Sequence, residues 1–212
     1  MMAGTIRIEA LIFDFGGVIS LPQNPDRVRD MIEVFGNGLS QADFLKIYGR
    51  HRHEYDRGTI QAEEYWKLVA GEVGRPLSAA ALERLRELDI ASWFNVNPAS
   101  LEFIREMKKK VKRLGLLSNM NHEGARHLRA SYAWLDLFNG LFLSCDYRLI
   151  KPHKEIFDIC LKSLGVEADA SLFLDDSAAN IEGCRKLGMH GLQFTGLEEV
   201  KRRLAEEYSF VA

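Results

Sequence analysis

Polar side chains stand at the ends of four short apolar runs in this sequence. These are Asp14 in the run 10–15, Ser118 and Asn119 at the end of 113–118, Lys151 after 140–146, and Asp175 and Asp176 in 171–176. Carboxylates are the hard oxygen ligands that suit Mg²⁺. A hydroxyl near a helix start and a lysine ammonium both bind phosphate oxygens. Together these residue types indicate a site for a phosphate group and a divalent metal ion.

Each residue has an expected role in such a site. Asp14 and Asp176 are the expected metal ligands, with waters and phosphate oxygens completing the coordination of Mg²⁺. Ser118 and Asn119 precede a predicted helix, so a hydroxyl and free backbone N–H groups would hold the phosphate. Lys151 would supply a positive charge to the same group.

Two further polar residues are expected to support these. Asp175 is interpreted as a residue that orients Asp176 rather than as a ligand. Asn180 lies four residues beyond Asp176 in a predicted helix, where it would orient Lys151 or the acids.

The elements that position these side chains follow from the apolar pattern. The four runs, with a weaker fifth at 190–194, are nearly continuous in apolar residues, which is typical of parallel strands covered on both faces. Helical patterns separate the later runs, at 98–110, 153–164 and 178–187. Alternating strands and helices predict an α/β fold with a Rossmann-like parallel sheet. Ligands bind beyond the carboxyl ends of such strands, which is where the polar residues stand.

The first strand departs from this alternation. No strand pattern occurs between Ser20 and Asn97, and helical patterns fill the interval at 25–36, 40–56, 61–74 and 78–91. We therefore predict a core domain of residues 1–20 and 97–212. A helical cap domain of residues 21–96 is inserted into it, and 93–98 form the return hinge.

Composition narrows the class of protein. The chain has 212 residues, of which 47% are hydrophobic, and a formal net charge of −2, so it can bury a sizeable core and carries no basic excess for nucleic acid. No apolar run approaches the length of a membrane span, and the first residues lack a signal-peptide pattern. Three cysteines without metal-ligand spacing are expected to be reduced thiols, so we expect a cytoplasmic protein. The oligomeric state stays open.

Four segments, in this order, resemble the motifs of the haloacid dehalogenase-like (HAD) hydrolase superfamily. They are IFDFGGV, LGLLSN, IKPHKEIF and LFLDDSAANIEGCRKLGM. FDFGGV, DRGTIQAEEYWKLV and FLDDSAANI further resemble the branch with bacterial sugar-phosphate phosphatases and the phosphatase domains joined to epoxide hydrolases. The resemblance implies a HAD fold with a helical cap. It also implies a Mg²⁺-dependent phosphatase acting on a small phosphorylated metabolite, such as a sugar phosphate.

The resemblance also implies a mechanism. Asp14 would attack phosphorus and form an aspartyl-phosphate that water then hydrolyses. Asp14, the backbone carbonyl of Gly16 and Asp176 would hold the metal, and Lys151 would screen the charges of Asp14 and of the transferring group.

Gly16 departs from the family pattern, in which most phosphatases carry an aspartate that protonates the leaving alcohol. One account is a phosphatase that needs little protonation or borrows a donor such as His122 or His153. A second is a degenerate site kept for binding or regulation. A third is a 2-haloacid dehalogenase, which the paired acids of the fourth motif oppose. Gly16 and Gly17 are both expected to be needed for the tight turn.

The predicted cap contains the cluster YGRHRHEYDR, residues 48–57. On one continuous helix, Tyr48, Arg52 and Tyr55 would share a face, and His53 would lie on another with Arg50, Glu54 and Arg57. Either this helix is simply solvated or one face borders the site and selects the substrate. The sequence leaves that choice and the natural substrate open.

Overall fold

A computed structural model describes residues 5–36 and 38–211; residues 1–4 of the predicted core segment, Asn37 and residue 212 lie outside the described residues. The central element is a five-stranded sheet in the order β4-β3-β2-β5-β6, and each adjacent pair of strands is parallel. The strands are β2 (Ala10–Phe13), β3 (Arg113–Ser118), β4 (Gly140–Leu143), β5 (Ser171–Asp175) and β6 (His190–Gln193). The predicted α/β fold with a parallel sheet is therefore confirmed.

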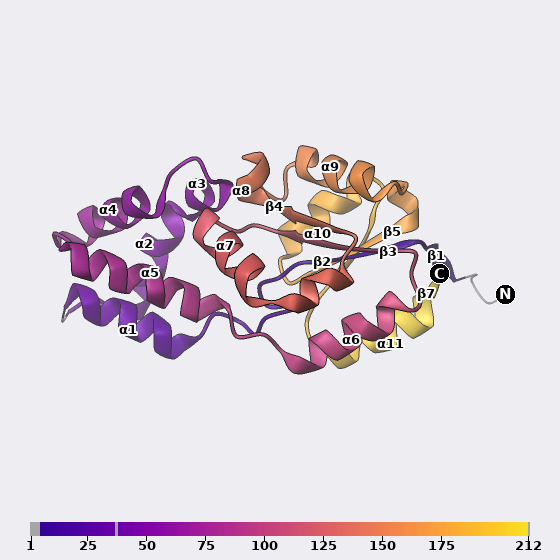
Figure 1. Cartoon of the computed structure of the whole chain (residues 1–212), viewed down its shortest axis with the longest axis horizontal. Coiled ribbons are helices and arrows are strands. Elements are labelled where there is room, and N and C mark those ends of the chain that lie inside the picture. The colour runs from indigo at the N-terminus through magenta and orange to yellow at the C-terminus, as the bar shows by residue number, and fades with distance from the viewer. Residues whose placement is uncertain (1–4, 37, 212) are drawn as a thin grey trace.

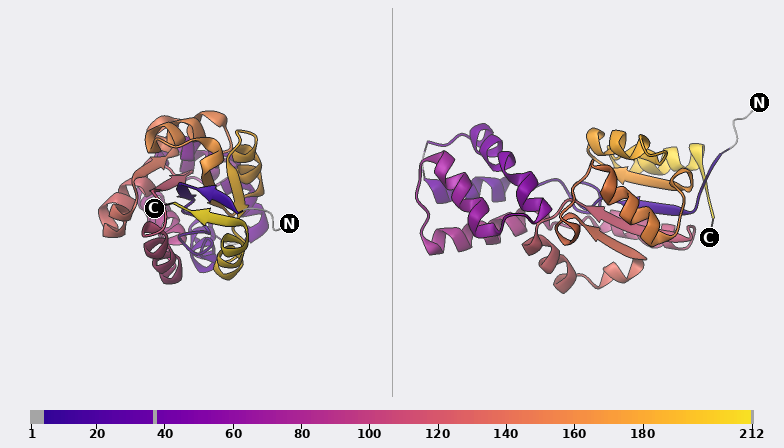
Figure 2. Two further views of the ribbon diagram at one scale, coloured as in Figure 1. Left: turned by 90° about the vertical axis from the view of Figure 1, so that its right-hand side faces the viewer. Right: turned by 90° about the horizontal axis from the view of Figure 1, so that it is seen from above.

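Helices cover both faces of this sheet (Figures 1 and 2). They are α6 (Pro98–Lys108), α7 (His122–Ser131), α9 (Lys154–Leu164), α10 (Ala178–Arg185) and α11 (Leu197–Glu207). Alternate strand residues serve the two faces, since Leu11 and Phe13 share a core cluster with α6, α7 and α11, whereas Ile12 lies in the cluster of α9 and α10. Burial on both sides explains why the strands read as continuous apolar runs.

Some elements differ from the prediction. The run predicted as a strand over 140–146 leaves the sheet after Leu143, and Ser144–Tyr147 form the short helix α8. A small parallel pair, β1 (Ile6–Ile8) with β7 (Tyr208–Phe210), was not predicted, because three residues are too few to show a period. Helix α11 was also missed. Two short 3₁₀ segments, η1 (Ala133–Leu137) and η2 (Ala168–Ala170), lie in connections.

Five helices form a separate lobe at one end of the molecule, and the two chain ends lie at the other (Figure 1). They are α1 (Pro25–Phe35), α2 (Gln41–Arg50), α3 (Arg52–Arg57), α4 (Ala62–Val73) and α5 (Ala79–Trp93). The lobe has its own apolar cluster, which includes Met31, Trp66 and Leu85. Ser20 and Val96 form an antiparallel bridge where the chain enters and leaves it.

The predicted single helix over 40–56 is wrong. His51, at φ −102° and ψ 3°, interrupts it, so α2 ends at Arg50 and α3 starts at Arg52. The assumed continuous helical faces therefore do not exist, although Arg52 does lie over the rings of Tyr48 and Tyr55.

Cys145, Cys160 and Cys184 are buried and free of disulfides. Among the helices in the described part of the chain, none combines the length and apolarity needed to cross a membrane.

Candidate active site

Lys151 is the centre of the polar cluster beyond the strand ends. Its ammonium donates to the backbone carbonyl of Leu117 at 3.0 Å and lies 2.8 Å from Asp14 Oδ1 and 2.7 Å from Asp175 Oδ2. Burial alone would lower the pKa of Lys151, but the charges of Asp14 and Asp175 outweigh it and the pKa is raised. Lys151 is therefore a fixed positive charge with all three of its protons directed at named oxygens.

Asp14 directly follows β2 and is 7% exposed. Its Oδ1 also accepts from the Phe15 N–H at 2.7 Å. Burial raises the pKa of the Asp14 carboxyl to about 6, although Lys151 and a hydrogen bond with Ser118 oppose the rise. Additional positive charge at this position would favour the ionised carboxylate.

Asp175, at the end of β5, is fully buried, and both of its carboxylate oxygens already accept hydrogen bonds. Besides Lys151, its oxygens accept from the Ser177 N–H at 2.8 Å and from Asn180 Nδ2 at 3.0 and 3.1 Å. Asp175 thus orients Lys151, and Asn180 on α10 orients Asp175. This differs from the expected action of Asp175 on Asp176.

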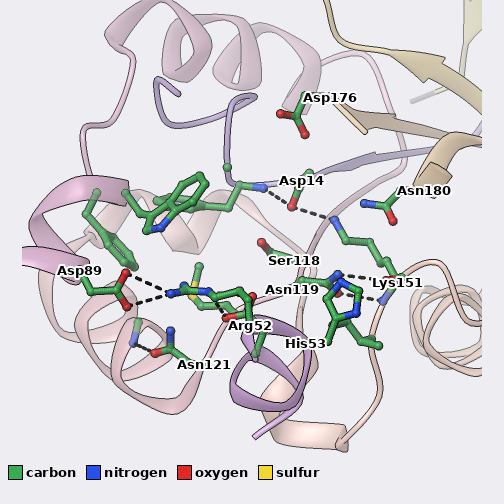
Figure 3. Close-up of a pocket in the computed structure, with 18 of the residues that line it drawn as sticks. Asp14, Arg52, His53, Asp89, Ser118, Asn119, Asn121, Lys151, Asp176 and Asn180 are labelled. Carbon is green, nitrogen blue, oxygen red and sulfur yellow. Dashed lines mark hydrogen bonds and ion pairs between the residues drawn. The ribbon is translucent and has the colours of Figure 1, made fainter. Parts of the chain in front are cut away.

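Asp176 is the exposed member of the acid group, and Figure 3 shows its carboxylate on the same side of the cavity as Asp14. Carboxylate oxygens of Asp14, Asp175 and Asp176 lie within 4.8 Å of one another. Burial raises the pKa of Asp176, and the charge of Asp175 adds to the rise. Three carboxylates facing one ammonium leave two negative charges, so an all-oxygen donor set with this charge fits a hard divalent cation such as Mg²⁺.

Ser118 is the last residue of β3, Asn119 follows it, and both line the same cavity. The side chain of Asn119 accepts from the Lys151 N–H at 2.8 Å and donates to the Lys151 carbonyl at 3.1 Å. The Asn119 side chain therefore fixes the backbone of Lys151. The backbone N–H of Asn119 is then the group of this residue that can face a phosphate. Helix α7 begins nearby, with Asn121 as its N-cap.

The two glycines after Asp14 have different reasons to be there. Gly17 has φ +68°, and a Cβ at Gly17 would lie 2.7 Å from Asp176 Oδ2, so both the turn and the close approach require glycine. Gly16 is outside the left-handed region, and a Cβ there would make ordinary contacts of 3.6 and 3.8 Å with the ring of Trp93. The expectation that the turn needs glycine at both positions is therefore wrong for Gly16.

A cavity of about 400 Å³ opens from these residues toward the helical lobe. Arg52, His53, Asp89 and Trp93 line it from the lobe, and Figure 3 shows Arg52 and Asp89 across the cavity from Asp14. Sequence reasoning left the cluster 48–57 undecided and overlooked Asp89. The only available signal was the concentration of charged and aromatic residues.

Arg52 is held rigidly in this wall. Its Nη1 donates to both carboxylate oxygens of Asp89 at 3.0 Å, and its Nε lies 3.0 and 3.1 Å from the two oxygens of Asp56. Burial raises the pKa of Asp56 to about 6, with Arg52 acting against the rise. His122 and His153, named above as examples of a donor that the phosphatase account could borrow, are not among the residues that line the cavity, whereas His53 is.

The model of the haloacid dehalogenase-like hydrolase family matches residues 8–188, most of the chain. This chain belongs to that family. Asp14, Ser118, Lys151 and Asp176 of the hydrolase all lie within the matched residues.

Relatives of the hydrolase include two phosphatases. It is 28% identical to D-ribitol-5-phosphate phosphatase from Bacteroides thetaiotaomicron over 88% of this chain and 91% of the relative. It is 26% identical to the sesquiterpene phosphatase astK from Aspergillus oryzae over 88% of this chain and 90% of the relative. A HAD-family enzyme from Bacteroides thetaiotaomicron, solved with magnesium and inorganic phosphate, shares its fold, with a TM-score of 0.70, 20% identity and coverage of 88% and 93%.

Proposed function

We propose that this hydrolase is a Mg²⁺-dependent phosphatase that cleaves a phosphate monoester of a small metabolite through an aspartyl-phosphate. The observation that carries the proposal is the Lys151 ammonium held between Asp14 and Asp175, with Asp176 open to the cavity beside them. The relatives named as phosphatases, and the related fold solved with magnesium and phosphate, support it.

Asp14 is the proposed nucleophile. One of its carboxylate oxygens forms a bond to phosphorus while the bond from phosphorus to the ester oxygen breaks. The ester oxygen leaves with the bonding electron pair and takes its proton from water. Water then hydrolyses the aspartyl-phosphate, which releases phosphate and restores the carboxylate. Lys151, fixed by Asp175 and the Leu117 carbonyl, keeps Asp14 ionised and offsets negative charge on the transferring group.

Asp14, the Gly16 carbonyl and Asp176 are the proposed ligands of Mg²⁺. When bound, the ion offsets the repulsion between the carboxylate and the phosphate dianion. The Ser118 hydroxyl and the Asn119 backbone N–H are the proposed hydrogen-bond donors to the phosphate oxygens. Asn119 and Asn180 also act indirectly, through their bonds to Lys151 and Asp175.

Residues 21–96 are the proposed cap domain, and 1–20 with 97–212 the core. The separate apolar cluster of the lobe supports this division. Two backbone hydrogen bonds where the chain enters and leaves the lobe also support it. The Leu21 N–H donates to the Asn95 carbonyl at 2.8 Å, and the Asn97 N–H donates to the Ile19 carbonyl at 2.9 Å.

Gly16 also favours a second candidate, a degenerate site that binds phosphorylated ligands without turning them over. A screen of phosphorylated metabolites with Mg²⁺, using Asp14→Asn as the blank, separates the two. Release of phosphate by the parent protein alone supports the phosphatase. Ligand-dependent thermal stabilisation without phosphate release from any compound supports the binding protein. Chloride release from 2-chloropropionate would support the dehalogenase alternative instead.

A further inference from the structure

One relative is named as a sesquiterpene phosphatase and the other as a phosphatase of the polyol phosphate D-ribitol 5-phosphate. The names of the relatives therefore do not decide the substrate class of this hydrolase. The walls of the cavity differ in a way that bears on it. The apolar lining residues of the cavity include Phe15, Ile90, Trp93, Phe94 and Met120. Phe94 packs against Phe15, and Phe94 and Met120 both approach Gly124, so these residues form a continuous apolar surface.

Trp93 is the part of this apolar lining nearest the reacting group. Its ring lies 3.6 and 3.8 Å from the position of a Cβ on Gly16, two residues after Asp14. The indole N–H donates to the Tyr48 hydroxyl at 3.0 Å, and that hydroxyl hydrogen-bonds Asp89. Trp93 is therefore held in place, and a group leaving from phosphorus meets an aromatic surface where a carboxylate could have stood.

The charged side chains Arg52, Asp56 and Asp89, which line the cavity from the lobe, are paired with one another. Arg52 pairs with Asp56 and Asp89 and lies over the rings of three tyrosines. Among the described side chains that line the cavity from the lobe, His53 has no hydrogen-bond or ion-pair partner within the chain, and Arg52 uses its Nε and Nη1 but not its Nη2 in these contacts. The hydrocarbon part of an apolar alcohol gains free energy by leaving water for the apolar lining, whereas each hydroxyl of a polyol that loses water must find a polar partner or cost binding free energy.

We propose, as a refinement that rests on the proposed phosphatase function, that the substrate is the phosphate ester of a mainly apolar alcohol whose hydrocarbon part lies on Trp93. The alcohol occupies the space between Trp93 and Met120, and the phosphate lies at Asp14, Ser118 and Lys151.

The test compares esters of primary alcohols, so that leaving-group chemistry stays similar. kcat/KM is measured with Mg²⁺ for benzyl phosphate and ribitol 5-phosphate, with p-nitrophenyl phosphate as the reference for turnover. Benzyl phosphate should exceed ribitol 5-phosphate by at least about tenfold, the scale on which apolar pockets discriminate between substrates. Because ribitol is the more acidic alcohol, leaving-group chemistry works against this outcome. Equal values, or a preference for ribitol 5-phosphate, would overturn the inference.

Two variants connect the preference to Trp93. Trp93→Ala should lower the benzyl-to-ribitol ratio by about tenfold, and Trp93→Phe, which keeps an aromatic ring, should largely retain it. A ratio unchanged in a folded Trp93→Ala protein contradicts the inference, and Trp93→Phe decides the question if the alanine variant does not fold.

Binding separates this inference from the proposed function. Calorimetry measures the Kd of benzylphosphonate and of 2,3-dihydroxypropylphosphonate in the presence of Mg²⁺, and neither compound can be hydrolysed at phosphorus. If no ester is turned over but benzylphosphonate binds at least about tenfold tighter, the phosphatase proposal fails and the apolar subsite stands. If turnover is observed but the two phosphonates bind equally, the subsite proposal fails alone.

Discussion

Gly16 has no side chain that could donate a proton to the leaving oxygen, and replacing it by aspartate tests the consequence of that lack. Without an acid positioned near the leaving oxygen, negative charge builds up there in the transition state. The rate should then fall steeply as the leaving alcohol becomes more basic. Because Gly16 has no left-handed backbone angle and a Cβ there makes ordinary contacts with Trp93, Gly16→Asp should fold with little loss of stability.

The expected gain depends on the leaving group. General acid catalysis contributes roughly 10²–10⁴-fold, which is about 3–5 kcal/mol of transition-state stabilisation. Since the ring of Trp93 restricts the new carboxyl, we expect the lower end, about 10²-fold in kcat/KM for primary alkyl phosphates. For p-nitrophenyl phosphate, whose leaving group needs no proton, we expect a change of less than about threefold.

The assay is kcat/KM for a series of phosphate monoesters with graded leaving-group pKa, with Mg²⁺, for the parent protein and Gly16→Asp. Two matched controls stand beside it. Gly16→Ala should keep the steep parental slope, because it adds the Cβ without the acid. Gly17→Ala should lose activity and Mg²⁺-dependent stabilisation, because it forces φ +68° on alanine and places a Cβ 2.7 Å from Asp176 Oδ2.

Two results would refute this reasoning. A flat series for the parent protein would mean that another group already donates the proton. An equal gain for every ester in Gly16→Asp, or the same gain in Gly16→Ala, would mean that the substitution acts on packing rather than on proton transfer.

Four further outcomes are expected. Asp14→Asn should keep the fold and retain less than about 1% of phosphatase activity; higher residual activity, shown not to come from contamination, would remove Asp14 as the nucleophile. Asp176→Ala should abolish the rise in melting temperature that Mg²⁺ causes in the parent protein, and an unchanged rise would remove Asp176 from the metal site. His53→Gln should leave the steep leaving-group slope as it is, whereas a slope that is flat in the parent and steep in the variant would identify His53 as the donor. Burial raises the pKa of Asp56 from 3.8 to about 6, so its protonation stabilises the fold fully below about pH 4, and this contribution is lost as the pH rises through 6. Asp56→Asn, which cannot ionise, should therefore show a smaller fall in the free energy of unfolding between pH 4 and pH 8 than the parent protein, as urea unfolding at the two pH values would measure; an unchanged pH dependence would contradict the assignment.

The sequence by itself determined the sheet and the residues beyond its strands. Continuous apolar runs require cover on both faces, and parallel strands bring their carboxyl ends to one edge. Asp14, Ser118, Lys151 and Asp175 could therefore be expected in one place, although they come from four distant parts of the chain. Their types indicated phosphate and metal chemistry before any distance was known.

Only the tertiary structure decided how these residues are connected. The pairing of Asn119 with the backbone of Lys151 depends on the exact meeting of two loops, which no local pattern encodes. The division of labour between Asp175, which binds Lys151, and the exposed Asp176 depends on which side chain points into the core.

The cavity wall formed by the lobe was out of reach for the same reason. Helical periodicity predicted a single helix over 40–56, but the break at His51 gives α3 its own start, and Arg52 is held by a partner 37 residues away, Asp89. The close approach of the Trp93 ring to Gly16 likewise depends on how the helical lobe packs against the sheet. Periodicity reports which face of one element is apolar, whereas the identity of the neighbour across a cavity is set by long-range packing.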